Sequence, residues 1–371
     1  MRAGWMVASL LLACSDGLPV AANDAGPTDA TIVDAQPEAD VAELEAATCD
    51  RTTCGSGCVD TTTDGQNCGA CGHSCLGGAC TAGVCKPVKL ASNGTSGAQV
   101  LAIDSTYVYF SAPKEIARVA KSGGAVEQVV PTTSAATSMA INGGVIYWVG
   151  QSSLYSAPVA GASAPTFLYA SISPLSIAVD ANNVYWGEHG GSVHQAPKNG
   201  AGPVLTLASN LVAPSCVLVD ATSVYWVNDD VPIAGVFRAT IGVANSGALL
   251  PGVDTNGLFD PHSLVLDDSG RLWFTSTVAG AEDGGTLHIA PIDGGPETIV
   301  GPVLWDENAA RNSGAIYYST NSTGQVLTTP FDGGPQQVLA SGYNLTVGIA
   351  ADDTAVYYTD AFVGDVWKLA L

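Results

Sequence analysis

A motif of one apolar residue followed by two aromatic residues recurs seven times after residue 100. The repeats begin at Val108, Ile146, Val184, Val224, Leu272, Ile316 and Val356, with spacings of 38, 38, 40, 48, 44 and 40 residues. A period of this length indicates repeated supersecondary units, none of which can bury its apolar face alone. The repeat therefore constrains the possible folds more than any other feature of the chain.

Each unit contains four short strand-like segments. In the third unit these are residues 176–180, 184–186, 192–195 and 204–207, and Asn199-Gly200 supplies one of the turns between them. No helical period is present. Four short strands with turns of this kind are typical of a β-propeller blade. We therefore expect an all-β, seven-bladed propeller of four-stranded blades over residues 86–371.

The two ends of the repeat region complement each other. The last repeat stops after its third strand, at 366–371, and the segment 88–92 is similar to the fourth strand of the preceding repeat. A strand donated from the N-terminal end would close the ring and remove an exposed edge. We predict that 88–92 completes the seventh blade.

Several polar positions recur and are interpreted as parts of the blade. An Asp or Asn stands four residues before each aromatic motif, where its side chain can cap a turn. His194 and His288 occupy corresponding places on third strands. Cys216 lies at the start of a first strand, and we expect it to be a small buried thiol. The recurring Asp and Asn residues are Asp104, Asn142, Asp180, Asp220, Asp268, Asn312 and Asp352.

The Val-Tyr-Trp core and the segment Tyr357-Tyr358-Thr359-Asp360 resemble the extracellular propellers of the YWTD and NHL families, over about 285 residues. The resemblance implies the fold but no activity, because propellers include both binding modules and enzymes. YWTD propellers have six blades, so their ligand sites are not transferred to these seven repeats.

The first residues have the features of an export signal. Arg2 precedes an apolar run at 5–13 that is too short to span a bilayer as a helix. Leu11-Leu12-Ala13-Cys14 resembles the bacterial lipobox, which implies a signal peptide at 1–13 and lipid attachment at Cys14. With Ser15 next, the resemblance implies the outer membrane or cell surface. An ordinary signal peptide is the alternative.

Two segments precede the repeats. Residues 15–48 contain eight acids and neither Lys nor Arg, which predicts a disordered acidic linker. Residues 49–85 contain most of the cysteines, and in an exported chain this density predicts four disulfides of undetermined pairing. A zinc site is the alternative, because Cys68-Gly69-Ala70-Cys71 has knuckle spacing. The cysteines are Cys49, Cys54, Cys58, Cys68, Cys71, Cys75, Cys80 and Cys85.

The run from Asn67 to Cys75, with the cysteines that follow it, resembles the stigma-specific-protein-like module. That resemblance implies a small extracellular adhesion or spacer unit.

The charge balance excludes one class of partner. The chain has 34 acidic and 12 basic residues, for a formal net charge of -22. Nucleic-acid binding depends on clustered Lys and Arg, and no basic stripe is present. We expect no nucleic-acid partner, and membrane association only through the lipid anchor.

Acids and histidines that do not recur fall mainly in loops after second strands and between repeats, and these loops share one face of a propeller. They can hold Ca²⁺ or another divalent cation, or bind a cationic or saccharide ligand. Acids that simply face water are the alternative. This candidate ligand face comprises Glu188, His189, Asp229, Asp230, Asp260, His262, Asp306, Glu307 and Asp360.

No recognised catalytic or phosphate-binding motif is present. We therefore expect a monomeric, non-catalytic module that binds a protein or saccharide and requires no cofactor. The alternatives are a metal-dependent hydrolase, lactonase or lyase acting through the candidate ligand face, and a structural spacer of the envelope.

The lipid anchor can be tested by replacing its attachment residue. We expect the Cys14→Ser chain to move from the membrane fraction to the soluble fraction, because a thioether-linked lipid then has no attachment atom. Ser15→Ala is the matched control and should stay with the membranes. A Cys14→Ser chain that still sediments with membranes would contradict the lipoprotein assignment.

Overall fold

The computed structural model describes residues 51–55, 57–92, 100–150, 152–161, 163–228, 234–253, 259–277, 284–304, 306–320, 323–344 and 346–371. Its contacts divide the chain into two units, with the boundary between Lys86 and Pro87. Within these ranges no helix has the length and apolar character needed to cross a membrane.

The smaller unit consists of two short hairpins cross-linked by disulfides. β1 (Thr52–Cys54) pairs with β2 (Gly57–Val59), and β3 (Cys80–Thr81) pairs with β4 (Val84–Cys85). Cys58 is also disulfide-bonded, and Cys49 lies outside the described residues. Every described cysteine of this unit is oxidised, which excludes the zinc alternative for them and is typical of an extracytoplasmic protein. The three defined bonds are Cys54–Cys71, Cys68–Cys80 and Cys75–Cys85.

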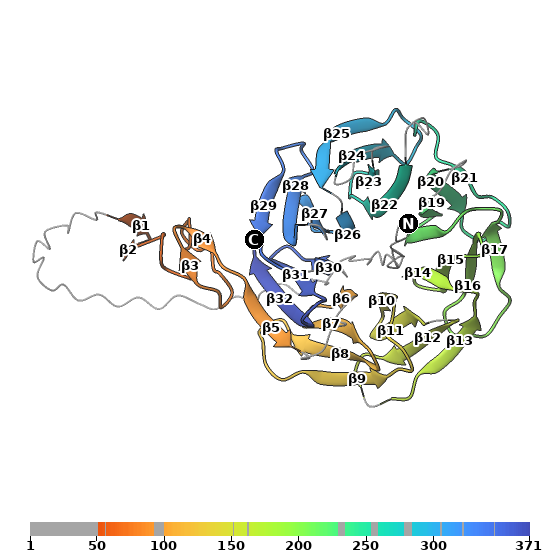
Figure 1. Ribbon diagram of the computed structural model, residues 1–371, viewed down its shortest axis with the longest axis horizontal. Coiled ribbons are helices and arrows are strands. Elements are labelled where there is room, and N and C mark those ends of the chain that lie inside the picture. Colours follow the sequence, from red (N-terminus) through yellow and green to blue (C-terminus); the bar gives the residue numbers. More distant parts are fainter. Residues whose placement is uncertain are drawn as a thin grey trace, which may run out of the picture. The chain divides into compact units, whose positions relative to one another are not determined.

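The larger unit is a ring of seven antiparallel four-stranded sheets, which confirms the predicted seven-bladed propeller (Figure 1). In each blade the first strand lies nearest the axis of the ring and the fourth lies at the rim (Figure 1). Blade 1 contains β6 (Leu101–Ile103), β7 (Tyr107–Ala112), β8 (Glu115–Ala120) and β9 (Glu127–Pro131). Blade 2 contains β10 (Ser138–Asn142), β11 (Val145–Val149), β12 (Ser153–Pro158) and β13 (Thr166–Ala170).

The next three blades follow in sequence. Blade 3 contains β14 (Pro174–Val179), β15 (Asn183–Glu188), β16 (Ser192–Pro197) and β17 (Leu205–Ala208). Blade 4 contains β18 (Pro214–Val219), β19 (Ser223–Asn228), β20 (Gly235–Thr240) and β21 (Ala248–Leu249). Blade 5 contains β22 (Phe259–Leu266), β23 (Arg271–Thr277), β24 (Gly284–Pro291) and β25 (Thr298–Leu304).

The last two blades end the ring. Blade 6 contains β26 (Asp306–Arg311), β27 (Ala315–Thr320), β28 (Gln325–Pro330) and β29 (Gln337–Ala340). Blade 7 contains β30 (Thr346–Ala351), β31 (Ala355–Asp360), β32 (Asp365–Ala370) and, from the other end of the unit, β5 (Val88–Ser92).

Strand β5 closes the ring as predicted. It pairs antiparallel with β32, so that Ser92 lies opposite Asp365 and Ala91 opposite Val366. The register then shifts by one residue and leaves Leu90 as an extra, buried side chain. Five other outer strands have the same kind of shift, which bends the rim of those blades. β5 therefore has the geometry of an ordinary fourth strand.

The apolar core lies between neighbouring blades. One cluster of buried side chains joins blades 1 and 2 and includes Tyr109 and Trp148. Another joins blades 4 and 5 and includes Tyr225 and Phe274. These residues belong to the repeated aromatic motif, so the motif packs the blades against one another.

The recurring aspartates hold the turn between first and second strands. Asp104 Oδ1 accepts the backbone N–H groups of Thr106 and Tyr107, each at 2.7 Å, while Oδ2 accepts the Tyr109 hydroxyl at 2.6 Å. We call this arrangement the Asp clamp. Asp180, Asp220 and Asp352 repeat it with Tyr185, Tyr225 and Tyr357.

In blade 5 the aspartate that holds the first turn lies one residue earlier than the sequence predicts. There the clamp is formed by Asp267, not by Asp268, and its Oδ2 accepts the Trp273 indole N–H at 2.9 Å. The turn is one residue longer than in the other blades, because Asp267 Oδ1 accepts the N–H of Arg271, four residues on. Asp268 is exposed and pairs with Arg311 at 2.8 Å.

Most of the positive charge of the propeller bridges neighbouring blades. The ten Lys and Arg residues of 86–371 include seven whose side chains reach an adjacent blade. The hydrogen bonds and ion pairs that these Lys and Arg side chains form across the junctions stabilise the ring. The seven are Arg118, Lys121, Lys198, Arg238, Arg271, Arg311 and Lys368.

Truncating the buried side chain of the closing strand should weaken the whole ring. We expect Leu90→Ala to lower the free energy of unfolding by about 2–5 kcal/mol, because Leu90 is only 7% exposed. Val338→Ala, on the exposed side of β29, is the matched control and should change it by less than about 0.5 kcal/mol. Urea unfolding with the disulfides intact measures both. Equal effects of the two variants would contradict the closure by β5.

Candidate functional site

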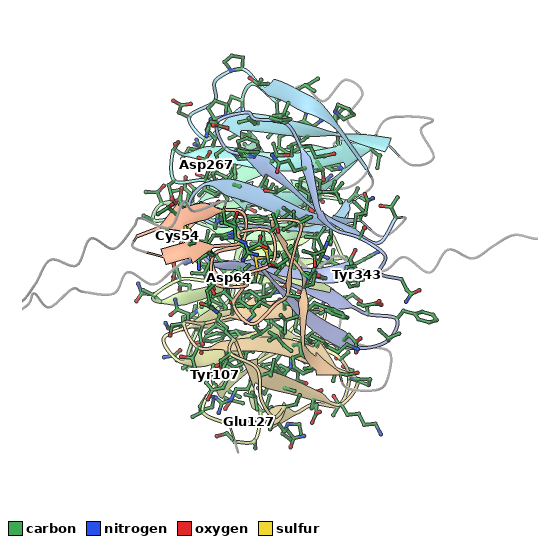
Figure 2. The ribbon with its side chains drawn as sticks, turned by 90° about the vertical axis from the view of Figure 1, so that its left-hand side faces the viewer. Cys54, Asp64, Tyr107, Glu127, Asp267 and Tyr343 are labelled. Atoms are coloured by element: carbon green, nitrogen blue, oxygen red, sulfur yellow. A yellow bond between two sulfur atoms is a disulfide. The ribbon has the colours of Figure 1, made fainter. Side chains whose placement is uncertain are left out.

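The propeller has two faces that differ in their connections. The turns between first and second strands and between third and fourth strands form what we call the hairpin face. The turns after second strands and the connections between blades form the loop face. Figure 2 shows Tyr343, from a connection between blades, on the side opposite to Tyr107 and Asp267 of the first turns. The sequence predicts the candidate ligand face on these loops.

Glu188, at the end of β15, is engaged by its surroundings. Its Oε1 accepts the Ser171 hydroxyl at 2.6 Å, the Ile172 N–H at 3.3 Å and the Trp186 indole N–H at 3.2 Å. Its Oε2 lies 3.4 Å from His194 Nε2. Burial on its own raises the pKa of Glu188, but these hydrogen bonds outweigh it and lower the pKa. Glu188 therefore fastens the connection from blade 2 to its own blade.

The same position carries a polar side chain with the same role in other blades. Asn228 Oδ1 accepts the Val212 N–H at 2.7 Å, and Asp360 Oδ2 accepts the Asn344 N–H at 3.1 Å. Asp360 is only 4% exposed. Both acceptors end a second strand and hold the connection that leads into their blade. By contrast, His189 is exposed.

The remaining predicted residues divide into two groups. Asp260 and His262 lie within β22, and Asp306 and Glu307 lie within β26, so all four belong to innermost strands and not to loops. Register shifts near the beginnings of β22 and β26 lengthen these two strands. The sequence gives no signal for this lengthening. Cys14, Asp229 and Asp230 lie outside the described residues. Glu188 and Asp360 belong to blades 3 and 7 and do not form one cluster.

Potential metal ligands gather at one place within the described ranges. Cys68, Cys75 and Cys85 lie close together, but each is part of a disulfide, so none is available as a thiolate ligand.

Cys216 is not the free thiol that the sequence predicts. It is fully buried on β18, as expected, but it is disulfide-bonded, so the predicted free thiol is wrong. In an oxidising compartment a thiol near a second cysteine forms a bond.

His194 and His288 occupy the same register in blades 3 and 5, opposite Trp186 and Phe274. Each imidazole packs on that aromatic ring, at centroid distances of 5.2 and 4.9 Å. Their polar partners differ. His288 contacts Glu297 and Ser276, whereas His194 contacts Glu188 and Thr206. Sequence reasoning missed the partners of His288, because pairing between strands brings them together.

The loop face exposes apolar side chains. Ile172, in the connection from blade 2 to blade 3, is 74% exposed, and Phe362, in the turn after β31, is 67% exposed. Val212 and Val363 are also exposed on this face. An interface with a protein partner buries exposed apolar side chains of this kind.

No protein-family model matches this chain, and no curated protein matches its sequence. Solved structures match it at the level of fold. A chain of the nidogen/laminin complex has 17% identity and a TM-score of 0.52, with 66% of this chain and 98% of that chain covered.

Two other solved propellers have similar scores. Selenomethionine-substituted virginiamycin B lyase from Staphylococcus aureus has 10% identity and a TM-score of 0.59, with 77% of this chain and 98% of that chain covered. The WD40 propeller domain of Doa1 has 12% identity and a TM-score of 0.62, with 77% and 97% covered. At these identities the similarity establishes the propeller fold and no activity.

The role of Glu188 can be tested against its neighbour. We expect Glu188→Ala to lower the free energy of unfolding by about 1–3 kcal/mol, because two half-buried donors, the Ser171 hydroxyl and the Trp186 indole N–H, lose their acceptor. His189→Ala, at an exposed position, should change it by less than about 0.5 kcal/mol. Thermal and urea unfolding measure both. A neutral Glu188→Ala would mean that this carboxylate is free for a ligand.

Proposed function

We propose that this chain is an exported bacterial lipoprotein whose propeller binds a protein partner through the loop face. The observation that carries the proposal is the exposure of Ile172 and Phe362 on that face. Burying side chains of this size against a partner contributes about 1.5–3 kcal/mol each, and charged side chains at the same positions would not.

The charges of the described residues support the same proposal. On the loop face Glu188 and Asp360 are engaged with backbone N–H groups, so they are poor candidates for ligand contacts. The nidogen/laminin structure is an example of a similar fold in a protein complex. Under this proposal binding requires no cofactor, the chain is a monomer, and the acidic linker holds the propeller away from the membrane.

The alternative of a metal-dependent hydrolase, lactonase or lyase would act through Asp229, Asp230 and the residues of β22 and β26. Virginiamycin B lyase is an enzyme with a similar fold. A chelator distinguishes the two functions, because protein binding through apolar loop tips is insensitive to EDTA and added Ca²⁺, Mg²⁺ or Zn²⁺. A melting temperature that falls with EDTA would favour the metal site.

Binding can be tested with paired variants of the full chain. Proteins retained from a cell-envelope extract should be lost with Ile172→Asp combined with Phe362→Asp, because charge on the loop tips opposes burial. The matched control is Ile299→Asp combined with Val338→Asp, at exposed apolar positions on the rim. It should retain the same proteins as the unmodified chain. Identical retention by the loop-face variant would contradict the proposed function.

A further inference from the structure

Blade 5 contains a buried chain of three polar side chains joined by hydrogen bonds. Ser276 lies near the end of β23, His288 lies in the middle of β24, and Glu297 immediately precedes β25. His288 Nδ1 is 2.5 Å from Glu297 Oε1, and His288 Nε2 is 2.9 Å from Ser276 Oγ. The side chains of His288 and Glu297 are 5% and 9% exposed.

The carboxylate determines which nitrogen of His288 acts as a base. Glu297 accepts hydrogen bonds, so Nδ1 carries the proton that the two atoms share. Nε2 then presents its lone pair to the hydroxyl groups of Ser276 and Thr286, the latter at 2.5 Å. The ring of Phe274 stacks on the imidazole at an interplanar angle of 11° and holds it in this orientation. A hydroxyl, a base and an orienting acid within hydrogen-bond distance of one another are the parts from which enzymes build an activated nucleophile.

Blade 3 contains a related set of side chains in which the two polar partners of the histidine are exchanged. His194 has the same register and the same stacking on an aromatic ring as His288. Its Nε2 faces the carboxylate of Glu188 at 3.4 Å, and its Nδ1 faces the Thr206 hydroxyl at 3.2 Å. The carboxylate and the hydroxyl are therefore exchanged relative to blade 5. In blade 3 the hydroxyl that faces the nitrogen away from the carboxylate is the secondary hydroxyl of Thr206, whereas in blade 5 the primary hydroxyl of Ser276 occupies this place.

We propose that Ser276, His288 and Glu297 form a hydrolytic site for esters with a small acyl group. Ser276 Oγ attacks the carbonyl carbon, and its proton moves to His288 Nε2. The C–O bond to the alcohol breaks, and the alcohol leaves with that proton. Water then attacks the acyl-serine and gives a proton to Nε2, the carboxylic acid is released, and Ser276 regains its proton. Glu297 stabilises the imidazolium that forms in both halves.

Burial restricts the substrate and indicates the route of approach. Ser276 is only 3% exposed, which limits the proposal to esters with a compact acyl group such as acetyl. Thr286 lies opposite Ser276 in the register of β23 and β24 and is half-buried. Its hydroxyl lies 3.2 Å from that of Ser276, so a carbonyl group that reaches Thr286 also reaches the nucleophile. This activity goes beyond the proposed binding function and uses none of its residues.

A fluorophosphonate probe and p-nitrophenyl acetate test the proposal on the full chain. We expect one phosphonate adduct per chain, on Ser276 by peptide mapping, and none on the Ser276→Ala variant. His288→Gln should slow the hydrolysis of p-nitrophenyl acetate by about 10²–10⁴-fold, because the general base is lost. His194→Gln is the matched control in blade 3, and it should keep both the adduct and the rate.

The Ser276→Cys variant keeps the proposal falsifiable where Ser276→Ala does not fold. It preserves the volume of the side chain, and its thiol should react with iodoacetamide in the folded protein. A folded Ser276→Cys chain that resists alkylation would overturn the proposal, because Ser276 would be out of reach. An alkylated Ser276→Cys chain beside an unlabelled natural chain would also overturn it, because Ser276 would be accessible but not nucleophilic.

Discussion

In four blades a single aspartate accepts two backbone N–H groups across the first turn and one tyrosine hydroxyl from the second strand. Asp180 is an example, with bonds of 2.6 and 2.7 Å to the turn and 2.6 Å to Tyr185. These bonds determine where the second strand begins, and therefore which side chains face the next blade. Trp186, one residue after Tyr185, is then buried against a neighbour. The packing between blades thus depends on a local polar contact in each hairpin.

Many charged side chains of the propeller contact the same turns and the junctions between blades. Asp352 accepts Lys121 from blade 1 as well as its own turn, and Lys368 donates to the Lys121 carbonyl across the same junction. Arg271 both supports the clamp at Asp267 and reaches the carbonyl of Phe331 in blade 6. The net charge of -22 is therefore not a description of a binding surface. Much of it serves turns and blade junctions, and apolar side chains remain exposed at the tips of the loop face.

The sequence predicted the blade count and the closing strand, because both depend on a period and on two complementary ends that are visible along the chain. It did not predict contacts that pairing between strands creates. Glu188 acts on Ser171 and Ile172, in the preceding connection, and Ser276 meets His288 across a hairpin. The one-residue longer turn at Asp267 also has no signal in the motif spacing. The period of the motif predicts the number of blades and the positions of their strands. The contacts of each side chain depend on the register with which the strands pair.

The repeated acids and tyrosines are structural parts of the blades, and a spectrophotometric titration of tyrosine tests this role most directly. Burial, together with the hydrogen bond to Asp220, raises the pKa of Tyr225 from 10.0 to about 12, and burial also raises that of Tyr317 to about 12. Because these pKa values are raised in the folded chain, the stability that the protonated hydroxyls contribute is complete below pH 10 and is lost as the pH rises towards 12.

We therefore predict that the clamp tyrosines stay protonated above pH 10 and ionise only as circular dichroism reports unfolding. Reversible ionisation of all 12 tyrosines near pH 10, with the fold intact, would contradict the account.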